Sequence, residues 1–409
     1  MAYHPRYRLS AVVLKAAEEL AAARAVVELL PLPFAQVRRP TRAFGVFSGA
    51  RASVAMQLVL CCTACTEPES FAFPSTRVVY DSELLRIHAA PGLEPCAGTG
   101  SSMDRTLEFF ARESGLPVLE EPLDLYWLPD EEVQAVCQTE MDIGGCFLST
   151  SESVTKDLPE EHELIHAYLQ RVGGGTSRYA FFDEGLALVY GSDSMQLAPT
   201  TDLQDAILFS RGLPLHHYAR AGHFVAFLVD EFGPEQTVGF VLDTYDVTPN
   251  SLASDFARHF GPSLSSVISS YETGTTSCTS AGWQRRADCE DLEPTPWSSE
   301  FSWTAEVGAG CSAIGSIGSF DGPIRERFGL QIDEAGVFDV RPERSSDARR
   351  PTVDLLRCGS CEDEFSFAHD LDDGWLVGLP LEPGFYIVTS TFESEADVEA
   401  TEVNVRRRP

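Results

Sequence analysis

The fold and the chemistry of this chain are both decided by one stretch, His162-Glu163-Leu164-Ile165-His166. On a helix, residues four apart lie on the same face, so the two histidines can converge on a single ion. Downstream, Glu184 stands in the run Asp183-Glu184-Gly185. Two imidazoles and a carboxylate leave the fourth position of a tetrahedral zinc open for water, and Glu163 stands where its carboxylate can accept that water's proton. The pattern therefore predicts a zinc site that activates water.

The composition is typical of a folded, strongly acidic protein. The 409 residues are enough for two or three domains, and 44% of them are hydrophobic and 22% charged. The formal net charge of −32 repels nucleic acid and anionic membrane surfaces, so we expect neither as a partner. An acidic surface of this kind fits a soluble protein that works outside the cytoplasm.

The N-terminal segment, residues 1–65, differs in charge from the rest of the chain. It carries eight Arg and Lys against three Glu, whereas residues 66–409 carry 22 Arg and Lys against 59 Asp and Glu. It ends in an apolar run, 52–65, in which small residues precede Cys65. These features resemble a bacterial lipoprotein signal, which predicts a lipidated Cys65, a membrane attachment only through that anchor, and a location at the cell surface or in the periplasm. Its distance from Met1 is explained if translation starts later; a buried helix with incidental cysteines is the alternative.

Cysteine counting supports export. Eight cysteines lie beyond the signal-like segment, and an even number predicts disulfides in an exported chain. Cys137 with Cys146 and Cys278 with Cys289 are close enough in sequence to bond locally, although the connectivity stays open. The motif Cys358-Gly359-Ser360-Cys361 could be a redox or zinc motif, but no second Cys pair accompanies it, so we expect a structural bridge.

Residues 70–155 alternate strand and helix signals, which predicts a small α/β lobe before the metal motif. The last predicted strand could be an edge on which an extended peptide lies. The predicted elements are a hairpin at 77–80 and 84–88, a helix at 104–113, and strands at 123–128 and 145–150.

Residues 156–275 have a helical pattern and predict a helical lobe. Asp157, three residues before Glu160, resembles a helix cap, so the metal-binding helix should run from there to about Arg171 and end at the glycines 173–175. Further helices are expected from near Asp183, over 218–232, and over 255–271 with a break at Gly261-Pro262.

The C-terminal part of the sequence predicts β structure. Residues 276–297 are rich in Ser, Thr, Gly and Pro and form a linker, whereas residues 298–409 contain short apolar runs divided by turn signals, as in a β-sandwich. The predicted fold class is therefore α+β, with an α/β lobe and a helical lobe followed by an all-β sandwich.

The metal motif, the run Asp183-Glu184-Gly185-Leu186-Ala187 and the helix that begins at Tyr218 resemble a gluzincin metallopeptidase over about residues 145–271. Seventeen residues separate His166 from Glu184, one fewer than in the aminopeptidase branch, and the Gly-x-Met-Glu-Asn signature of that branch is absent. The chain is therefore more similar to the peptidase MA-like proteins of bacteria. The resemblance implies a zincin-like catalytic domain, with His162, His166 and Glu184 as zinc ligands and Glu163 as general base and acid.

Two further residues have expected roles. In similar enzymes a tyrosine that heads the equivalent helix stabilises the oxyanion, which makes Tyr218 the candidate donor. His217 and His223 are its rivals, and an ordinary packed aromatic is the alternative. Asp183 could orient a ligand imidazole, or it could instead N-cap the second helix.

The predicted function is hydrolysis of peptide bonds in a peptide or protein substrate by a zinc-activated water. A zinc-binding but catalytically inactive surface adhesin is the alternative, and the presence of every ligand together with Glu163 argues against it. A solvated acidic helix with an incidental second histidine would also require the context of Glu184 to be a coincidence.

Overall fold

The computed structural model describes residues of one unit of the chain. Internal contacts divide the chain into Met1–Glu69 and Ser70–Pro409, and every described residue belongs to the second unit. The signal-like segment with Cys65, the cysteines at 278 and 361 and most of the predicted linker lie outside the described residues. Among the helices of the described ranges, none is long and apolar enough to cross a membrane. These ranges are 74–138, 144–149, 151–174, 179–191, 203–207, 212–243, 251–274, 289–290, 292–308, 310–343, 351–358, 376–395, 398 and 401–408.

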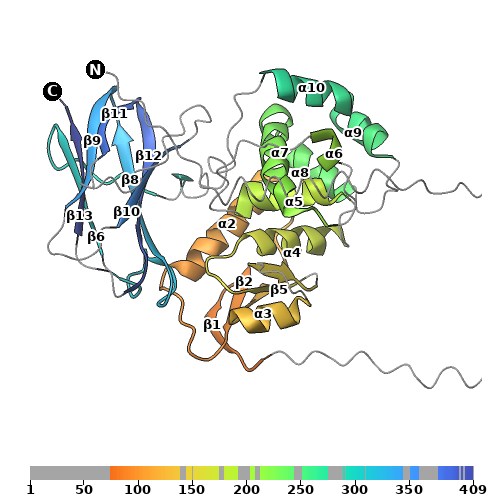
Figure 1. The fold of residues 1–409 in the computed structure, drawn as a ribbon, viewed down its shortest axis with the longest axis horizontal. Helices are drawn as coiled ribbons and strands as arrows, with labels where there is room; N and C mark the ends of the chain where they lie inside the picture. The colour runs from red at the N-terminus through yellow and green to blue at the C-terminus, as the bar shows by residue number, and fades with distance from the viewer. Residues whose placement is uncertain are drawn as a thin grey trace, which may run out of the picture. The chain divides into compact units, whose positions relative to one another are not determined.

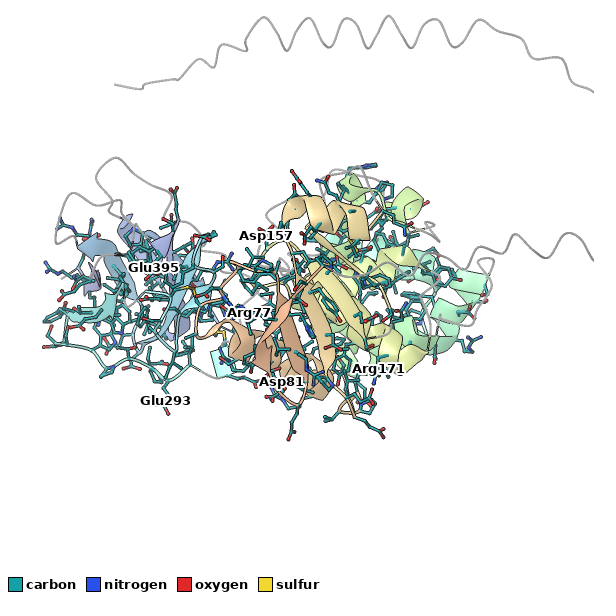
Figure 2. The ribbon with its side chains drawn as sticks, turned by 90° about the horizontal axis from the view of Figure 1, so that it is seen from below. Arg77, Asp81, Asp157, Arg171, Glu293 and Glu395 are labelled. Carbon is teal, nitrogen blue, oxygen red and sulfur yellow. A yellow bond between two sulfur atoms is a disulfide. The ribbon has the colours of Figure 1, made fainter. Side chains whose placement is uncertain are left out.

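A five-stranded mixed sheet opens the described fold (Figure 1). Its order is β1-β2-β3-β5-β4; β1–β2 and β4–β5 are antiparallel, and β2–β3 and β3–β5 are parallel. The predicted hairpin is confirmed, and Arg77 and Asp81 mark the two ends of its first strand in Figure 2. The strands are β1 (Arg77–Asp81), β2 (Leu85–Ala89), β3 (Leu123–Trp127), β4 (Gly145–Phe147) and β5 (Glu152–Thr155).

The edge strand β4 is shorter than the predicted strand over 145–150. The chain turns after Phe147, with the Leu148 N–H bonded to the Glu152 carbonyl at 2.7 Å, and returns as β5. The sequence analysis missed β5 because its four residues, Glu-Ser-Val-Thr, have no apolar alternation. β4 therefore lies at the end of the sheet, next to the metal motif.

Most of the helices share one hydrophobic core with a face of this sheet, whereas α3 packs over a separate small cluster that contains Val133 and Val154. The predicted helix over 218–232 is confirmed, and the predicted break at Gly261 separates α9 from α10. The helices are α2 (Thr99–Glu113), α3 (Asp130–Val136), α4 (His162–Gly173), α5 (Ala180–Gly191), α6 (Leu203–Ala206), η1 (Leu215–His217), α7 (Tyr218–Phe232), α8 (Pro234–Asp243), α9 (Leu252–Phe260) and α10 (Leu264–Gly274).

The predicted cap of the metal-binding helix is wrong. α4 begins at His162, and Asp157 belongs to the connection after β5, where the Thr155 hydroxyl accepts from its N–H and donates to its carbonyl. Asp157 therefore lies in a turn four residues before Glu161, the N-cap of α4. The C-terminal prediction is right, since α4 ends at Gly173 and Gly174 adopts the left-handed conformation with φ 73°.

Two four-stranded antiparallel sheets form the C-terminal part of the described chain, and we call them the β-sandwich because their buried side chains share one core. The strand orders are β10-β12-β8-β7 and β11-β9-β13-β6. Trp303, Phe338, Tyr386 and Val405 are among the core residues. The strands are β6 (Ser302–Val307), β7 (Ile317–Gly318), β8 (Ile324–Ile332), β9 (Gly336–Glu343), β10 (Thr352–Arg357), β11 (Leu376–Leu381), β12 (Gly384–Phe392) and β13 (Thr401–Arg407).

Three disulfides join described residues. The local pair Cys137–Cys146 is confirmed. The other local pair is wrong, because Cys289 bonds Cys358 instead of Cys278. The third bridge joins Cys96 and Cys311, which lie 215 positions apart in the sequence. Disulfides of this number are typical of proteins that fold outside the cytoplasm.

Gly185 provides a test of the packing between α5 and α7. A Cβ at this position would lie 2.4 Å from Val225 Cγ2 and 2.8 Å from the Ala221 carbonyl oxygen. We expect Gly185→Ala to lower the free energy of unfolding by about 1–3 kcal/mol, measured by denaturant titration. The control, Gly239→Ala in α8, places its Cβ no closer than 3.6 Å to another residue, so it should be neutral or stabilising by up to about 1 kcal/mol. Equal effects at both sites would contradict this account.

Candidate metal centre

α4 presents both histidines of the motif toward one point. The helix buries the run from Leu164 to Gln170, and the i to i+4 spacing then leaves His162 and His166 on a shared face. Their Nε2 atoms lie 3.3 Å apart. The His166 side chain is 3% exposed and that of His162 16%, so the pair meets solvent at the His162 side.

Glu184 reaches the same point from α5. Its Oε2 atom lies 3.2 Å from His162 Nε2 and 3.3 Å from His166 Nε2. Close helix packing permits this approach, because Gly191 at the end of α5 rests on the start of α4. A Cβ on Gly191 would lie 2.6 Å from the backbone nitrogen of His162. Among the described residues, these three form the group that could hold a metal ion.

The charges of the three groups are coupled. Burial alone would raise the pKa of Glu184, but the charges and hydrogen bonds of His166 and His162 bring it well below the ordinary value. Burial alone would lower the pKa of His166, but Glu184 and Asp183 outweigh it and raise that pKa well above 6.5. The cluster therefore holds a carboxylate anion that attracts positive charge, and a metal ion would compete with protons for the imidazoles.

Asp183 lies behind His166. Its Oδ2 atom is 3.4 Å from His166 Nδ1, the ring nitrogen that faces away from the cluster. The interpretation of Asp183 as an N-cap is wrong, because α5 begins at Ala180 and Asp183 lies one turn inside the helix. A carboxylate at Nδ1 favours the ring orientation in which Nε2 points toward Glu184.

Tyr218 stands beside His162 at the start of α7. The two ring centroids are 6.2 Å apart and the ring planes differ by 22°. Burial, the charge of Glu184 and a contact with its carboxylate all raise the pKa of Tyr218 well above its ordinary value, so the hydroxyl keeps its proton. The ring also packs against the hydrophobic core, so the packed-aromatic alternative describes part of its environment.

The rivals of Tyr218 have other surroundings. His223 points its Nδ1 atom at the Tyr271 hydroxyl, at 2.5 Å. Burial and the charge of Arg220 lower the pKa of His223 to about 4. His217 is a buried residue of η1, in ring contact with the exposed His216 at 4.0 Å between centroids.

Glu163 lies against the edge strand. A Cβ on Gly145 of β4 would lie 3.2 Å from Glu163 Cγ. The sequence analysis considered Glu160 only as the partner of Asp157 in a helix cap. In the structure its Oε1 atom accepts the Glu163 N–H at 3.3 Å and so caps α4. Burial and the charge of Glu163 raise the pKa of Glu160 to about 7. The spacing of three residues between the two glutamates, which matches a cap, is the signal that could have identified it.

Phe147 of β4 is the second residue that the sequence analysis missed. Its ring centroid lies 5.4 Å from that of His166. This contact places the last residue of the edge strand against a member of the candidate metal group. Alternation within the strand over 145–150 does not by itself predict such a contact.

The chain has low similarity to known proteins. No family model matches the sequence, and no curated protein matches it. The periplasmic inhibitor of g-type lysozyme from Aeromonas hydrophila is similar over 29% of this chain and 96% of its own, with 16% identity and a TM-score of 0.21. Aminopeptidase A of Legionella pneumophila, in complex with aspartic acid, is similar over 78% of this chain and 36% of its own, with 11% identity and a TM-score of 0.31.

A third solved structure, a cycloisomaltooligosaccharide glucanotransferase of Paenibacillus sp., is similar over 27% of this chain and 17% of its own, with 19% identity and a TM-score of 0.14. This chain therefore covers about a third of the aminopeptidase and less of the glucanotransferase. At these TM-scores the likenesses carry no conclusion about activity, and the function has to be argued from the site.

Asp183→Asn tests the contact behind His166. The amide keeps the shape of the side chain but loses the charge at Nδ1, so we expect the metal affinity to fall about 10- to 100-fold, measured by competition with a chromophoric chelator. The control is Asp130→Asn, since Asp130 also lies in the first turn of its helix but is exposed on α3. Asp183→Asn with wild-type affinity would show that the carboxylate does not orient the ring.

Proposed function

We propose that this chain is a zinc-dependent peptidase of the gluzincin type, with the mixed sheet and its helices as a zincin-like catalytic domain. The observation that carries the proposal is the triangle formed by two Nε2 atoms and one Oε2 atom, with sides of 3.2, 3.3 and 3.3 Å. Three ligands of a tetrahedral zinc, each about 2.0–2.1 Å from the ion, lie about 3.3–3.4 Å from one another. Calcium and magnesium prefer sets of oxygen ligands, so the donors present fit zinc.

Glu163 is the residue that moves protons in this proposal. When bound, zinc supplies Lewis acidity, which lowers the pKa of a water molecule and polarises a carbonyl group. Glu163 accepts the proton of the attacking water and then donates it to the leaving amine. Its charge is one of the causes of the raised pKa of Tyr218, which supports a common location of the two side chains.

Tyr218 is the proposed donor to the oxyanion. A donor must keep its proton at the working pH, and the raised pKa of Tyr218 meets that requirement. Its rival His223 is engaged with Tyr271.

A peptide substrate is supported by the position of β4 at the end of the sheet. An extended chain can add to such an edge through main-chain hydrogen bonds, which hold it independently of its side chains. Phe147 at the end of β4 and Glu163 beside Gly145 connect this edge to the metal group. Peptide-bond hydrolysis therefore fits the surroundings of the site better than hydrolysis of a compact small molecule.

The proposed location is extracytoplasmic, as a bacterial lipoprotein anchored through Cys65. The disulfides support the compartment, and the signal-like segment supports the anchor. A zinc-binding adhesin without turnover remains the alternative function, and the presence of Glu163 beside the ligands counts against it.

Glu163→Gln separates the two functions. We expect about one zinc per chain in wild type and in the variant, with casein hydrolysis in wild type alone, because the amide cannot accept a proton. Metal content is measured by mass spectrometry of the elements, and Glu108→Gln, at an exposed position of α2, is the matched control. Zinc without hydrolysis of a broad peptide library in wild type would support the adhesin, and absence of zinc would refute both functions.

Tyr218→Phe tests the oxyanion donor. Loss of one donor should lower kcat by about 10²- to 10³-fold with little change in KM, since the hydrogen bond is made in the transition state. Steady-state kinetics on a peptide, together with zinc content, provide the measurement. A variant with wild-type kcat would leave the tyrosine only its packing role.

A further inference from the structure

The edge strand β4 meets the metal centre through its first and last residues. A Cβ on Gly145 would lie 3.2 Å from Glu163 Cγ. At the other end, the ring centroid of Phe147 lies 5.4 Å from that of His166. Side chains alternate along a strand, so Cys146 points to the other face of the sheet, where it packs against the small cluster under α3. Cys146 can therefore hold β4 in place without entering the site.

Backbone pairing holds β4 along a short length. The strand pairs with β5 over its three residues and has no second neighbour among the described strands. Before the strand, the Lys156 N–H donates to the Gly144 carbonyl at 3.0 Å. After it, the Leu148 N–H donates to the Glu152 carbonyl at 2.7 Å. A strand of this length on one partner needs a further attachment if it is to stay in position.

The Cys137–Cys146 disulfide supplies that attachment by tying β4 to α3. Cys137 is the C-cap of α3, and its N–H donates to the Val133 carbonyl at 2.8 Å. Val133 and Val136 of α3 are buried in the cluster that also contains Val154 of β5. The disulfide therefore joins β4 to a helix that is packed on the neighbouring strand.

The helix that carries the two histidines is held by other contacts. The Ser153 hydroxyl of β5 donates to the Glu163 carbonyl at 3.1 Å, which fixes the first turn of α4 on β5. Gly191 of α5 packs on the backbone of His162. Neither contact involves β4, so a displaced β4 should leave the three candidate ligands in place.

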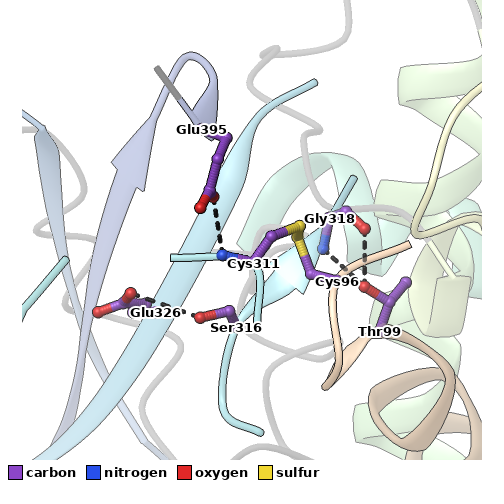
Figure 3. The surroundings of a disulfide bond; sticks show 7 residues. All are labelled: Cys96, Thr99, Cys311, Ser316, Gly318, Glu326 and Glu395. Atoms are coloured by element: carbon purple, nitrogen blue, oxygen red, sulfur yellow. Dashed lines mark hydrogen bonds between the residues drawn. A yellow bond between two sulfur atoms is a disulfide. The ribbon is translucent and has the colours of Figure 1, made fainter. Parts of the chain in front are cut away.

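The disulfides of the described chain differ in their access to solvent. Both cysteines of the Cys137–Cys146 bridge are half-buried. Those of the Cys96–Cys311 bridge are each 2% exposed, and Figure 3 shows its surroundings, in which the Cys311 N–H donates to Glu395 Oε2 at 2.8 Å. Thiol–disulfide exchange requires that the attacking thiol reach a sulfur atom. A dithiol should therefore reduce Cys137–Cys146 in the folded protein before Cys96–Cys311.

We propose that the Cys137–Cys146 disulfide is a positioning bond for substrate: it holds β4 in the extended form to which a peptide adds, and its reduction releases that strand. In the reduction a dithiol gives two electrons, the S–S bond breaks, each sulfur takes a proton from the dithiol, and the dithiol becomes a cyclic disulfide. Peptide then binds more weakly, because β4 has to be ordered again on binding. The inference rests on the proposed peptide-binding edge, but it does not require that the site hydrolyse the peptide.

The test measures binding of fluorescein-labelled casein by fluorescence anisotropy, in the full chain with Glu163→Gln to prevent cleavage. We expect Cys137→Ala/Cys146→Ala to raise the Kd about tenfold, since the ordering of β4 is then repaid from the binding free energy. The matched control, Cys289→Ala/Cys358→Ala, removes another half-buried disulfide and should leave the Kd unchanged. An unchanged Kd in the first pair, or an equal rise in both pairs, would overturn the inference.

Steady-state kinetics with Glu163 intact separate positioning from a loss of folding. In Cys137→Ala/Cys146→Ala we expect KM for casein to rise about tenfold and kcat to stay within about twofold of wild type, with about one zinc per chain. A fall in kcat together with a loss of zinc would show a general structural role and would refute the positioning role.

Mild reduction tests the same bond without a change at either cysteine. Dithiothreitol is added to the folded Glu163→Gln chain, and iodoacetamide labelling with mass spectrometry of one sample reports which thiols are free. We expect free thiols at Cys137 and Cys146 before Cys96 and Cys311, and a Kd for casein that rises in step with them in the unlabelled sample. A constant Kd while Cys137 and Cys146 are reduced would contradict the inference. Zinc-loaded protein that does not bind casein would refute the peptide-binding edge and this inference with it, whereas binding without hydrolysis in wild type would count only against the proposed activity.

Discussion

The contact between Glu184 and the two histidines of α4 is the interaction on which the rest of this structure depends. It places a carboxylate and two imidazoles within 3.3 Å of one another at the edge of a hydrophobic core. Burial would raise the pKa of the carboxylate if the imidazoles were absent, so the charges of the three groups are mutually dependent. Such a cluster is stable only if the two helices that carry it cannot separate. Gly191 serves this requirement, because it lets α5 approach the start of α4 at backbone distance, and Gly185 lets α5 pack as closely against α7.

Features that arise from local pattern could be predicted from the sequence. The helix Tyr218–Phe232 was predicted with both ends, since its apolar period stops at Gly233. The end of α4 at the glycines 173–175 was also predicted, and the short apolar runs of residues 298–409 predicted β structure there. In the metal centre, helical periodicity alone brings His162 and His166, at i and i+4, to one face, whereas Glu184 of α5 was expected from the resemblance to gluzincins.

Features that depend on contacts distant in sequence could not be predicted. The disulfides Cys96–Cys311 and Cys289–Cys358 join residues that lie 215 and 69 positions apart in the sequence. Nothing in the sequence around either cysteine of a pair indicates such a distant partner. The orientation of Asp183 is of the same kind. Aspartate is a common N-cap residue, which favoured a cap. Asp183 instead lies one turn inside α5, where its neighbour is His166 of another helix.

The two ligands on α4 differ in what defines their positions, and this difference explains why the sequence predicted one end of the helix better than the other. His166 lies in the buried middle of the helix, where the backbone hydrogen bonds of the helix and the packing of its neighbours determine the position of its side chain. His162 is the first helical residue, and its N-cap Glu161 makes no side-chain cap of its own. Two groups define that end instead: Glu160 accepts the Glu163 N–H, and Gly191 of α5 packs on the backbone of Glu161 and His162. Because Gly191 belongs to another helix, the geometry of the metal centre depends on the packing of α5 against α4 as well as on the five-residue motif.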